Sequence, residues 1–296
     1  MTTDTPIAYI DRTRAYYQAL GYGAPYIWAQ NDRIPFAALP AALHQMSVAL
    51  ITTAAPFQPD KGDQGPNAPY NAAAKFYEVY QLPVTPPPDL RISHVAIDRD
   101  HTTAEDSGTY LPLAALHRAV QSGRIGALVP QVFGLPTNRS QRHTVEVDCP
   151  DLLARVSVCG ADAAILVPNC PVCHQSVTLA ARALEEAGLP TVIMGCARDI
   201  VQRAGAPRFL FSDFPLGNAA GRPNDPDSQD ETLALALDLL EAARSPGTCR
   251  TSPLTWPGPS DWKSDYANPA KLSPGEIARR RAAFDQGKDT ARALRR

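Results

Sequence analysis

Two cysteines separated by two residues are the side chains best suited to chemistry in this sequence. The motif Cys-Pro-Val-Cys-His-Gln occupies residues 170–175, directly after the apolar segment Ala163–Val167 and Pro168-Asn169. A helical pattern starts at once. The free N–H groups and positive dipole of a helix start favour a thiolate, so we expect Cys170 to be a nucleophile. Cys173 is close enough in sequence to resolve an adduct on Cys170 as an intramolecular disulfide.

The neighbours of the two cysteines are further candidates. His174 would lower the thiolate pKa or donate a proton to a leaving group, and we expect Asn169 and Gln175 to assist in acid–base chemistry or substrate binding. The alternatives for the motif are half of a zinc site or two unreactive buried thiols. No second Cys-x-x-Cys or His-x-x-x-His lies nearby, so we predict no bound metal.

The other four cysteines, Cys149, Cys159, Cys196 and Cys249, are weaker candidates, and we expect the first three to be small core residues. Cys196 follows the apolar segment Thr191–Met194, so it could share a sheet edge with Cys170. This leaves a racemase or isomerase with two thiols flanking a carbon as an alternative function.

A second polar group lies within and directly after the predicted parallel strand Leu90–Ile97, which would bring it to the same sheet edge as Cys170. His94, Asp98 and Asp106 are expected to supply an acid–base pair or to orient a substrate, and the alternatives are a solvated acidic loop and a core histidine. Further along, Asp213, Phe214 and Asn218 lie in a loop whose backbone N–H groups could hold an anionic substrate end. That loop could equally be a plain connection.

The elements that position these residues alternate between strand and helix. Strands are predicted from apolar, often β-branched runs at Ser47–Thr53, Leu90–Ile97, Ile125–Pro130, Ala163–Val167, Thr191–Met194 and Arg208–Phe211. Helices are predicted at Leu113–Gln121, Pro150–Val158, His174–Ala187, Ala197–Arg203 and Glu231–Ala243. The pattern predicts an α/β fold with a doubly wound, mostly parallel sheet of the Rossmann or flavodoxin-like kind.

We expect a single catalytic α/β domain over residues 1–296, with three parts. Residues 1–88 form a proline-rich segment that wraps the sheet and carries the first strand, 89–245 form the core with the two cysteines, and 246–296 form a loop and a terminal helix from Pro274 to Arg295. Proline is frequent, at 29 of 296 residues, about double the usual share. Long ordered loops are the consequence.

Composition excludes several classes of protein. Lys and Arg number 28 against 30 Asp and Glu, a net charge of −2, which leaves no basic footprint for nucleic acid. No apolar run approaches the roughly 20 residues of a membrane span, and no signal peptide is evident. We therefore expect a cytoplasmic protein with a small-molecule substrate, and no nucleotide-binding signature is present.

Several blocks of the chain resemble one family. Over roughly residues 25–245 the sequence is similar to the selenoprotein B subunits of glycine, sarcosine and betaine reductases and to the related D-proline reductase selenoprotein subunit. Beside the motif at 168–175, the matching blocks, in the same order, are Ser93-His94 with Asp106 and Pro112-Leu113, then Gly123-Arg124-Ile125-Gly126, and later Phe214-Pro215-Leu216-Gly217 with Pro223-Asn224-Asp225-Pro226.

This resemblance implies roles for the two cysteines. Relatives commonly carry selenocysteine at the position of Cys170, where it attacks the substrate, and the residue at the position of Cys173 resolves the adduct. The amine-cleaving relatives also use a partner subunit with a carbonyl cofactor, which nothing in this chain supplies. A stand-alone enzyme therefore needs a bond that a thiolate attacks directly, such as one to sulfur, or to carbon in an activated heterocycle or thione.

Together these observations predict a reductase that cleaves a C–S, C–N or similar bond of a small polar metabolite. We expect no bound cofactor, an external dithiol or thioredoxin-like reductant, a homo-oligomer, and association with a partner reductase subunit as a further option. The alternatives are a general thiol–disulfide or peroxide reductase, the two-cysteine isomerase, and a non-catalytic subunit that docks through the basic residues Arg279–Arg281 and Arg292–Arg296 of the terminal helix.

Overall fold

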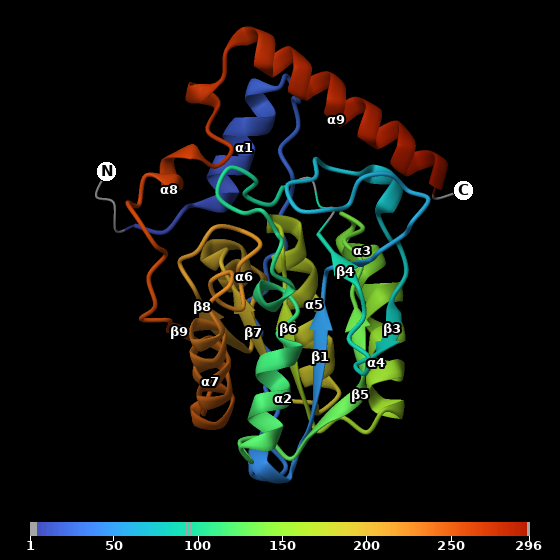
Figure 1. The fold of residues 1–296 in the computed structure, drawn as a ribbon, viewed down its shortest axis with the longest axis vertical. Helices are drawn as coiled ribbons and strands as arrows, with labels where there is room; N and C mark the ends of the chain where they lie inside the picture. Colours follow the sequence, from blue (N-terminus) through green and yellow to red (C-terminus); the bar gives the residue numbers. More distant parts are fainter. Residues whose placement is uncertain (1–4, 93, 95, 295–296) are drawn as a thin grey trace.

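Seven strands form one sheet in the computed structural model, which describes residues 5–92, 94 and 96–294. Ser93 and the last two arginines named above lie outside the described residues. The strand order is β3-β5-β1-β6-β7-β8-β9 (Figure 1). The bounds are β1 (Ser47–Thr52), β3 (Tyr80–Pro83), β5 (Ala127–Gly134), β6 (Ala163–Val167), β7 (Thr191–Gly195), β8 (Arg208–Phe211) and β9 (Thr248–Thr251). All neighbours pair in parallel except β3, which is antiparallel to β5.

The order of the parallel strands is that of a flavodoxin-like fold, as predicted. After β1, the chain adds β5 on one side and then β6, β7 and β8 on the other. The direction of winding therefore reverses between β1 and β6, and ligands of such sheets bind in the crevice at the carboxyl ends of the strands on either side of this point. The two-cysteine motif follows β6 and thus lies at this crevice.

Helices cover both faces of the sheet (Figure 1). One face is covered by α2 (Leu113–Gln121) and α7 (Pro226–Ala242), the other by α4 (Cys149–Val158), α5 (Pro171–Glu186) and α6 (Arg198–Ala204). Along β1, Val48 and Leu50 belong to the core under the first pair of helices, and Ala49 and Ile51 to the core under α4 and α5. Strands buried on both faces show continuous apolar runs rather than alternation, which is why β6 and β7 could be predicted.

Two helices lie across the carboxyl edge of the sheet: α1 (Tyr9–Ala19) and the long terminal helix α9 (Pro274–Leu294), at the top of Figure 1. The remaining short elements are β2 (Ala55–Pro56), β4 (Leu90–Arg91), α3 (Gln141–His143), α8 (Trp262–Asp265), a π-helical turn at Thr144–Asp148, and single 3₁₀ turns at Leu43–Gln45, Ala72–Ala74, Ser107–Thr109 and Pro269–Lys271. No helix in the described part of the chain is both long and apolar enough to cross a membrane.

The strand predicted over Leu90–Ile97 is wrong. Among the described residues of this stretch, only Leu90–Arg91 forms a ladder, and it pairs antiparallel with β2, outside the main sheet. Both edges of β1 are occupied, by β5 and β6, and β3 takes the outer edge of β5. No parallel position remains for this segment on that side, so His94 approaches the sheet edge from a loop.

The strand predicted to end at Pro130 continues to Gly134. The pairing of β1 with β5 shifts between Val48 and Leu50, and the extra residues of β5 include Pro130. A proline has no N–H to donate to a ladder, so an irregularity is where a strand tolerates one. The continuation brings residues 135–140 to the carboxyl edge of the sheet, beside the cysteines.

A buried ion pair ties α5 to β8 and to the N-terminal segment. The carboxylate of Glu185 accepts hydrogen bonds from Arg208 Nη1 and from the N–H of Thr191, each at 2.6 Å, and Arg208 also donates to the carbonyl of Ala37. Both charged side chains are almost completely buried. Removal of one partner would leave the other as an uncompensated buried charge.

We therefore expect Glu185→Ala to lower the free energy of unfolding by about 3–5 kcal/mol. The next residue is a matched control, because the Glu186 carboxylate is 68% exposed and 3.7 Å from Arg33. Glu186→Ala should change stability by less than about 1 kcal/mol. Urea denaturation at neutral pH measures both values, and similar losses in the two variants would contradict this account.

Candidate active site

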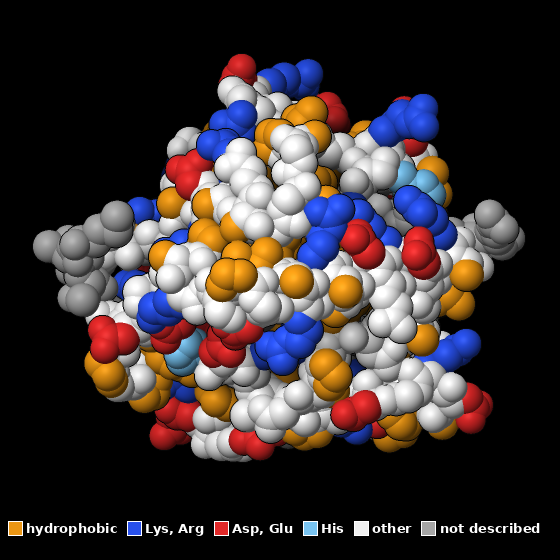
Figure 2. Space-filling model, turned by 90° about the horizontal axis from the view of Figure 1, so that it is seen from above, with side chains coloured by type: hydrophobic (Ala, Val, Ile, Leu, Met, Phe, Trp, Pro, Cys, Tyr) orange, Lys and Arg blue, Asp and Glu red, His pale blue; other side chains and the backbone are white. Residues whose placement is uncertain are grey.

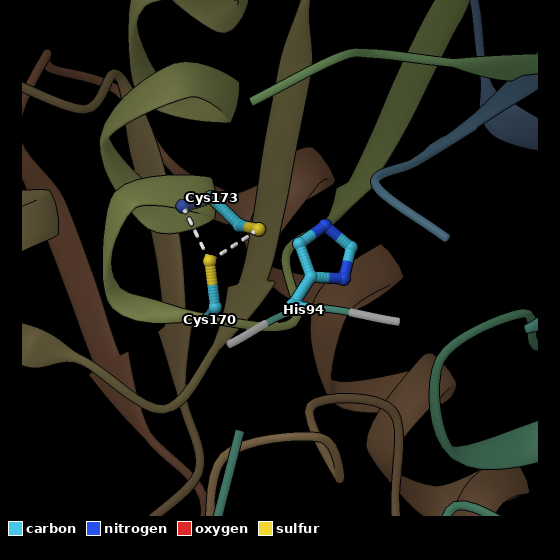
Figure 3. A group of neighbouring side chains, drawn as sticks. All are labelled: His94, Cys170 and Cys173. Carbon is cyan, nitrogen blue, oxygen red and sulfur yellow. Dashed lines mark hydrogen bonds between the residues drawn. The ribbon is translucent and has the colours of Figure 1, made fainter. Parts of the chain in front are cut away.

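The sulfurs of Cys170 and Cys173 lie 2.7 Å apart at the turn between β6 and α5 (Figure 3). Cys170 is the N-cap of α5, with extended backbone, and its sulfur accepts a hydrogen bond from the N–H of Cys173 at 3.3 Å. Pro171 occupies the first turn, where its missing N–H costs nothing. The turn is therefore an ordinary helix cap in which a thiol replaces the usual hydroxyl or carboxylate.

His94 lies beside the sulfur pair (Figure 3). One of its ring nitrogens and the two sulfurs all lie within 4.8 Å of one another. Its Nδ1 has no hydrogen-bond partner among the described residues, and Arg99 Nη2 fixes the loop by donating to the His94 carbonyl at 2.6 Å. His94 is thus placed to exchange a proton with the thiols.

The same three side chains are also possible metal ligands. Two thiolates and an imidazole match a zinc ligand set that keeps one position open. Among the described residues the group contains only His94, Cys170 and Cys173, so a tetrahedral ion would lack a fourth protein ligand. The arrangement can therefore serve either redox or metal chemistry on geometric grounds.

The two sulfurs differ in their tendency to ionise. Burial opposes ionisation of Cys173, but its contacts with the Cys170 thiol and with His94 lower its pKa well below the ordinary value. Thr137 Oγ1 lies 3.2 Å from the same sulfur. Burial and the adjacent sulfur raise the pKa of Cys170. The resting negative charge is therefore favoured on Cys173, whereas the helix-end argument alone placed it on Cys170.

A cavity of about 890 Å³ opens beside Cys170, a volume suited to a small organic molecule. Its walls come from α1, the loop after it, α9, the loop after β5 and the start of α5. The aromatic residues of the lining are Tyr17, Tyr22, Tyr26, Trp28, Tyr70, Phe76 and Phe284. Cys170 and His94 are part of the lining, and Cys173 lies behind them. A molecule in the cavity would therefore meet Cys170 first.

His174 is completely buried and does not line the cavity. Its Nε2 accepts the N–H of Cys196 at 2.9 Å, so its Nδ1 carries the proton and donates to the carbonyl of Cys170 at 2.8 Å. Burial lowers the pKa of His174 to about 4. Both ring nitrogens are thus engaged with backbone groups, which points to a positioning role. Proton transfer, which the sequence suggested for His174 or His94, fits His94 better.

Asn169 and Gln175 hold the surroundings of the motif in place. The backbone N–H and Nδ2 of Asn169 both donate to Thr53 Oγ1, at 3.1 and 3.0 Å. Gln175 Nε2 donates to the Tyr26 hydroxyl at 2.8 Å, and its Oε1 accepts the N–H of Ala29 at 2.7 Å. Gln175 thereby fixes part of the cavity wall without lining the cavity itself.

The structure does not bring the other predicted residues to the cavity, namely Asp98, Asp106, Asp213, Phe214 and Asn218. The Asp98 carboxylate contacts His101 Nδ1 at 3.0 Å, and Asp213 pairs with Lys263. Asp106 caps the turn at Ser107–Thr109. Phe214 packs against Trp256, and Asn218 Nδ2 donates to Thr102 Oγ1 at 2.6 Å. Each therefore has a structural partner, in its own loop for Asp98 and Asp106 and in a distant segment for Asp213, Phe214 and Asn218.

Sequence reasoning missed several cavity residues, among them Tyr17, Lys75, Arg139 and Phe284. Arg139 follows β5. A strand predicted to continue past Pro130 to Gly134 would have placed Arg139 near the carboxyl edge of the sheet. Tyr17 and Phe284 come from α1 and α9, near opposite ends of the chain, and no motif links them to the cysteines.

The fold and site define an α/β protein with a buried dithiol at the switch point of a flavodoxin-like sheet. In comparison with known proteins, the chain is similar to D-proline reductase subunit gamma of Acetoanaerobium sticklandii, with 29% identity over 160 residues. The aligned stretch spans 54% of this chain and 66% of that protein. No family model and no solved structure matches. The similarity supports a relationship to a reductase family.

The buried neutral imidazole of His174 predicts a pH dependence of stability. The pKa of His174 is about 4 in the folded chain and near 6.5 for an unperturbed histidine. Between these values the unfolded state binds more protons, so stability is lost as pH falls through that window. This group should contribute a loss of about 2 kcal/mol between pH 7 and pH 4.5.

His174→Phe removes the titrating group from both states. Urea denaturation measures the free energy of unfolding of both proteins between pH 7 and pH 4.5. Over this range the variant should lose about 2 kcal/mol less stability than the wild type. Below pH 4 the two profiles should run parallel. Identical slopes between pH 7 and pH 4.5 would show that His174 is not held neutral.

Proposed function

We propose that this protein is a reductase that cleaves a C–S, C–N or similar carbon–heteroatom bond of a small molecule through a covalent adduct on Cys170. The observation that carries this proposal is the pair of sulfurs 2.7 Å apart of which only Cys170 faces the cavity. The similarity to a D-proline reductase subunit supports the reductase class.

In the first step, the Cys170 sulfur attacks the substrate carbon and passes its proton to the Cys173 thiolate. A C–S bond to Cys170 forms, the bond between carbon and heteroatom breaks, and the heteroatom leaves with a proton from His94. The short contact between the sulfurs makes the proton shift a small movement. The nearby His94 supplies the second proton without a rearrangement of the site.

In the second step, His94 takes the proton of Cys173, and the resulting thiolate attacks the Cys170 sulfur. The disulfide forms, the C–S bond of the adduct breaks, and the departing carbon takes the proton from His94. The dithiol loses two electrons and the substrate gains them. A thioredoxin-like protein or a low-molecular-weight thiol then reduces the disulfide.

The chemistry limits the substrate. The carbon must leave Cys170 with its electron pair, so it needs an adjacent group that stabilises the charge, as in an activated heterocycle or thione. Since the relative is by its name one subunit of an enzyme, association with a partner reductase subunit is part of the proposal.

The two-cysteine isomerase is less well supported. It requires Cys170 and Cys196 on either side of one substrate carbon. Cys196 is buried, does not line the cavity, and its backbone N–H is bound to His174. Burial raises the pKa of its thiol, which opposes a role as a proton-abstracting thiolate.

We expect turnover to depend on Cys170. With a panel of thiones and thioethers, a substrate should be reduced while the protein loses about 2 Da, mapped to a disulfide between Cys170 and Cys173. Cys170→Ala should lower turnover by at least about a thousandfold, because no adduct forms. Cys196→Ala is the matched control and should retain activity. Activity in Cys170→Ala with an unchanged circular dichroism spectrum would refute the mechanism.

The resolving role of Cys173 predicts a trapped intermediate. In Cys173→Ser the first step can still proceed, with His94 taking the Cys170 proton and passing it to the leaving heteroatom, but no disulfide can form. Intact-protein mass spectrometry after incubation with the same substrate should show an adduct on Cys170 that persists without release of reduced product. Multiple turnovers by this variant would exclude the proposed second step and favour a mechanism with one cysteine.

A further inference from the structure

The cavity beside Cys170 differs in charge from the rest of the molecule. The chain as a whole has a net charge of −2, yet the described lining contains no Asp or Glu and five cationic residues, which are Arg14, Lys75, Arg139, Lys288 and Arg292. Seen from above, the face that carries α9 shows Lys and Arg side chains beside apolar ones, with Asp and Glu side chains among them (Figure 2). A cavity of this composition favours an anionic guest.

Three of these cations have carboxylate partners outside the lining. Arg14 pairs with Asp11, Lys288 with Asp285 and Arg292 with Asp289. Arg139 has no hydrogen bond or ion pair among the described residues. Instead, its guanidinium carbon lies 5.9 Å from the ring centres of Tyr17 and Tyr26 and 5.6 Å from that of Phe284.

The backbone of Arg139 is held in an unusual conformation. Its φ is +56°, in the left-handed region that non-glycine residues rarely adopt. The flanking residues fix the loop, since Asn138 Nδ2 donates to the buried Asp148 carboxylate at 3.1 Å and Ser140 caps α3. Strain of this kind persists where surrounding contacts enforce it and is concentrated at binding sites. The loop thus presents Arg139 to the cavity.

A guanidinium has five N–H donors in a planar fork that matches a carboxylate or similar oxyanion. The faces of aromatic rings stabilise the charge but satisfy none of these donors, which in this exposed residue are open to water or to a bound anion. Arg139, Tyr17, Tyr26 and Cys170 all line the same cavity. One bound molecule could therefore contact both Arg139 and Cys170.

We propose that the cavity binds a flat organic anion, with its acidic group on Arg139 and its unsaturated body against Tyr17 and Tyr26, so that the carbon to be reduced faces Cys170. This proposal names a substrate class for the proposed function. It rests on that function only in stating that the carbon facing Cys170 is reduced. The binding of the anion is a separate property, and it is testable without turnover.

Two alkylating agents of similar shape test whether the cavity beside Cys170 favours an anion. Iodoacetate is anionic and iodoacetamide is neutral. After reduction of the full chain, the ratio of their rate constants at Cys170 should be at least about tenfold higher than the ratio for N-acetylcysteine, because Arg139 attracts the carboxylate. Arg139→Gln should bring the ratio close to that of N-acetylcysteine.

The matched control is Arg142→Gln, three residues away. Arg142 does not line the cavity and its side chain is 85% exposed, 4.0 Å from Glu146. This variant should keep the wild-type ratio. Equal ratios in the wild type and Arg139→Gln would overturn the proposed role of Arg139.

Binding of a flat probe separates this inference from the proposed function. By calorimetry, 2-naphthoate should bind the wild type at least about tenfold more tightly than 2-naphthamide, and Arg139→Gln should abolish the preference. Equal affinity for both probes would overturn the inference. A cysteine unreactive to both reagents, combined with selective naphthoate binding, would instead refute the thiol chemistry and support the anion site.

Discussion

The geometry of the dithiol depends on the buried imidazole of His174. One ring nitrogen donates to the carbonyl of Cys170 and the other accepts the N–H of Cys196 at the end of β7. The ring thus joins the turn after β6 to the turn after β7. Gly195 makes room for it, since a Cβ there would lie 2.9 Å from the ring. A neutral histidine is required, because a protonated ring would have no acceptor for the Cys196 N–H.

Burial sets the chemistry of the sulfurs that this turn holds. A thiolate removed from water is costly unless nearby donors and charges compensate. Cys173 has the Cys170 thiol, Thr137 and His94 around its sulfur, whereas the capping N–H is the backbone partner of Cys170. A negative charge is therefore favoured on Cys173, whereas burial and the adjacent sulfur raise the pKa of Cys170, the sulfur that lines the cavity.

Much of this arrangement could be predicted from the sequence, for identifiable reasons. The strands β1, β6, β7 and β8 are buried runs with clear boundaries, and the motif follows one of them directly. His94 was expected at the same sheet edge as Cys170 because it was assigned to a parallel strand, but it reaches that edge from a loop. Arg139 was missed because Pro130 was taken as the end of its strand. No local pattern could have placed Tyr17 and Phe284 together, since their contact depends on how the two ends of the chain pack.

The two sides of the cavity differ in how deeply their elements are buried: α9 and the N-terminal segment form one side, which we call the roof, and β6 and α5 form the other, the floor. No residue of α9 is buried, and its contacts with the N-terminal segment are polar or aromatic, such as Arg281 to the carbonyl of Leu20 at 2.7 Å and Phe284 beside Tyr17. The floor consists of β6 and α5, whose cysteine-bearing turn is almost entirely inaccessible. Segments with few buried apolar contacts open at a small cost in free energy, whereas core strands open only with global unfolding. The cavity that leads to Cys170 is thus lined on one side by residues of α1 and α9, whereas the sulfur geometry is set by the turn between β6 and α5.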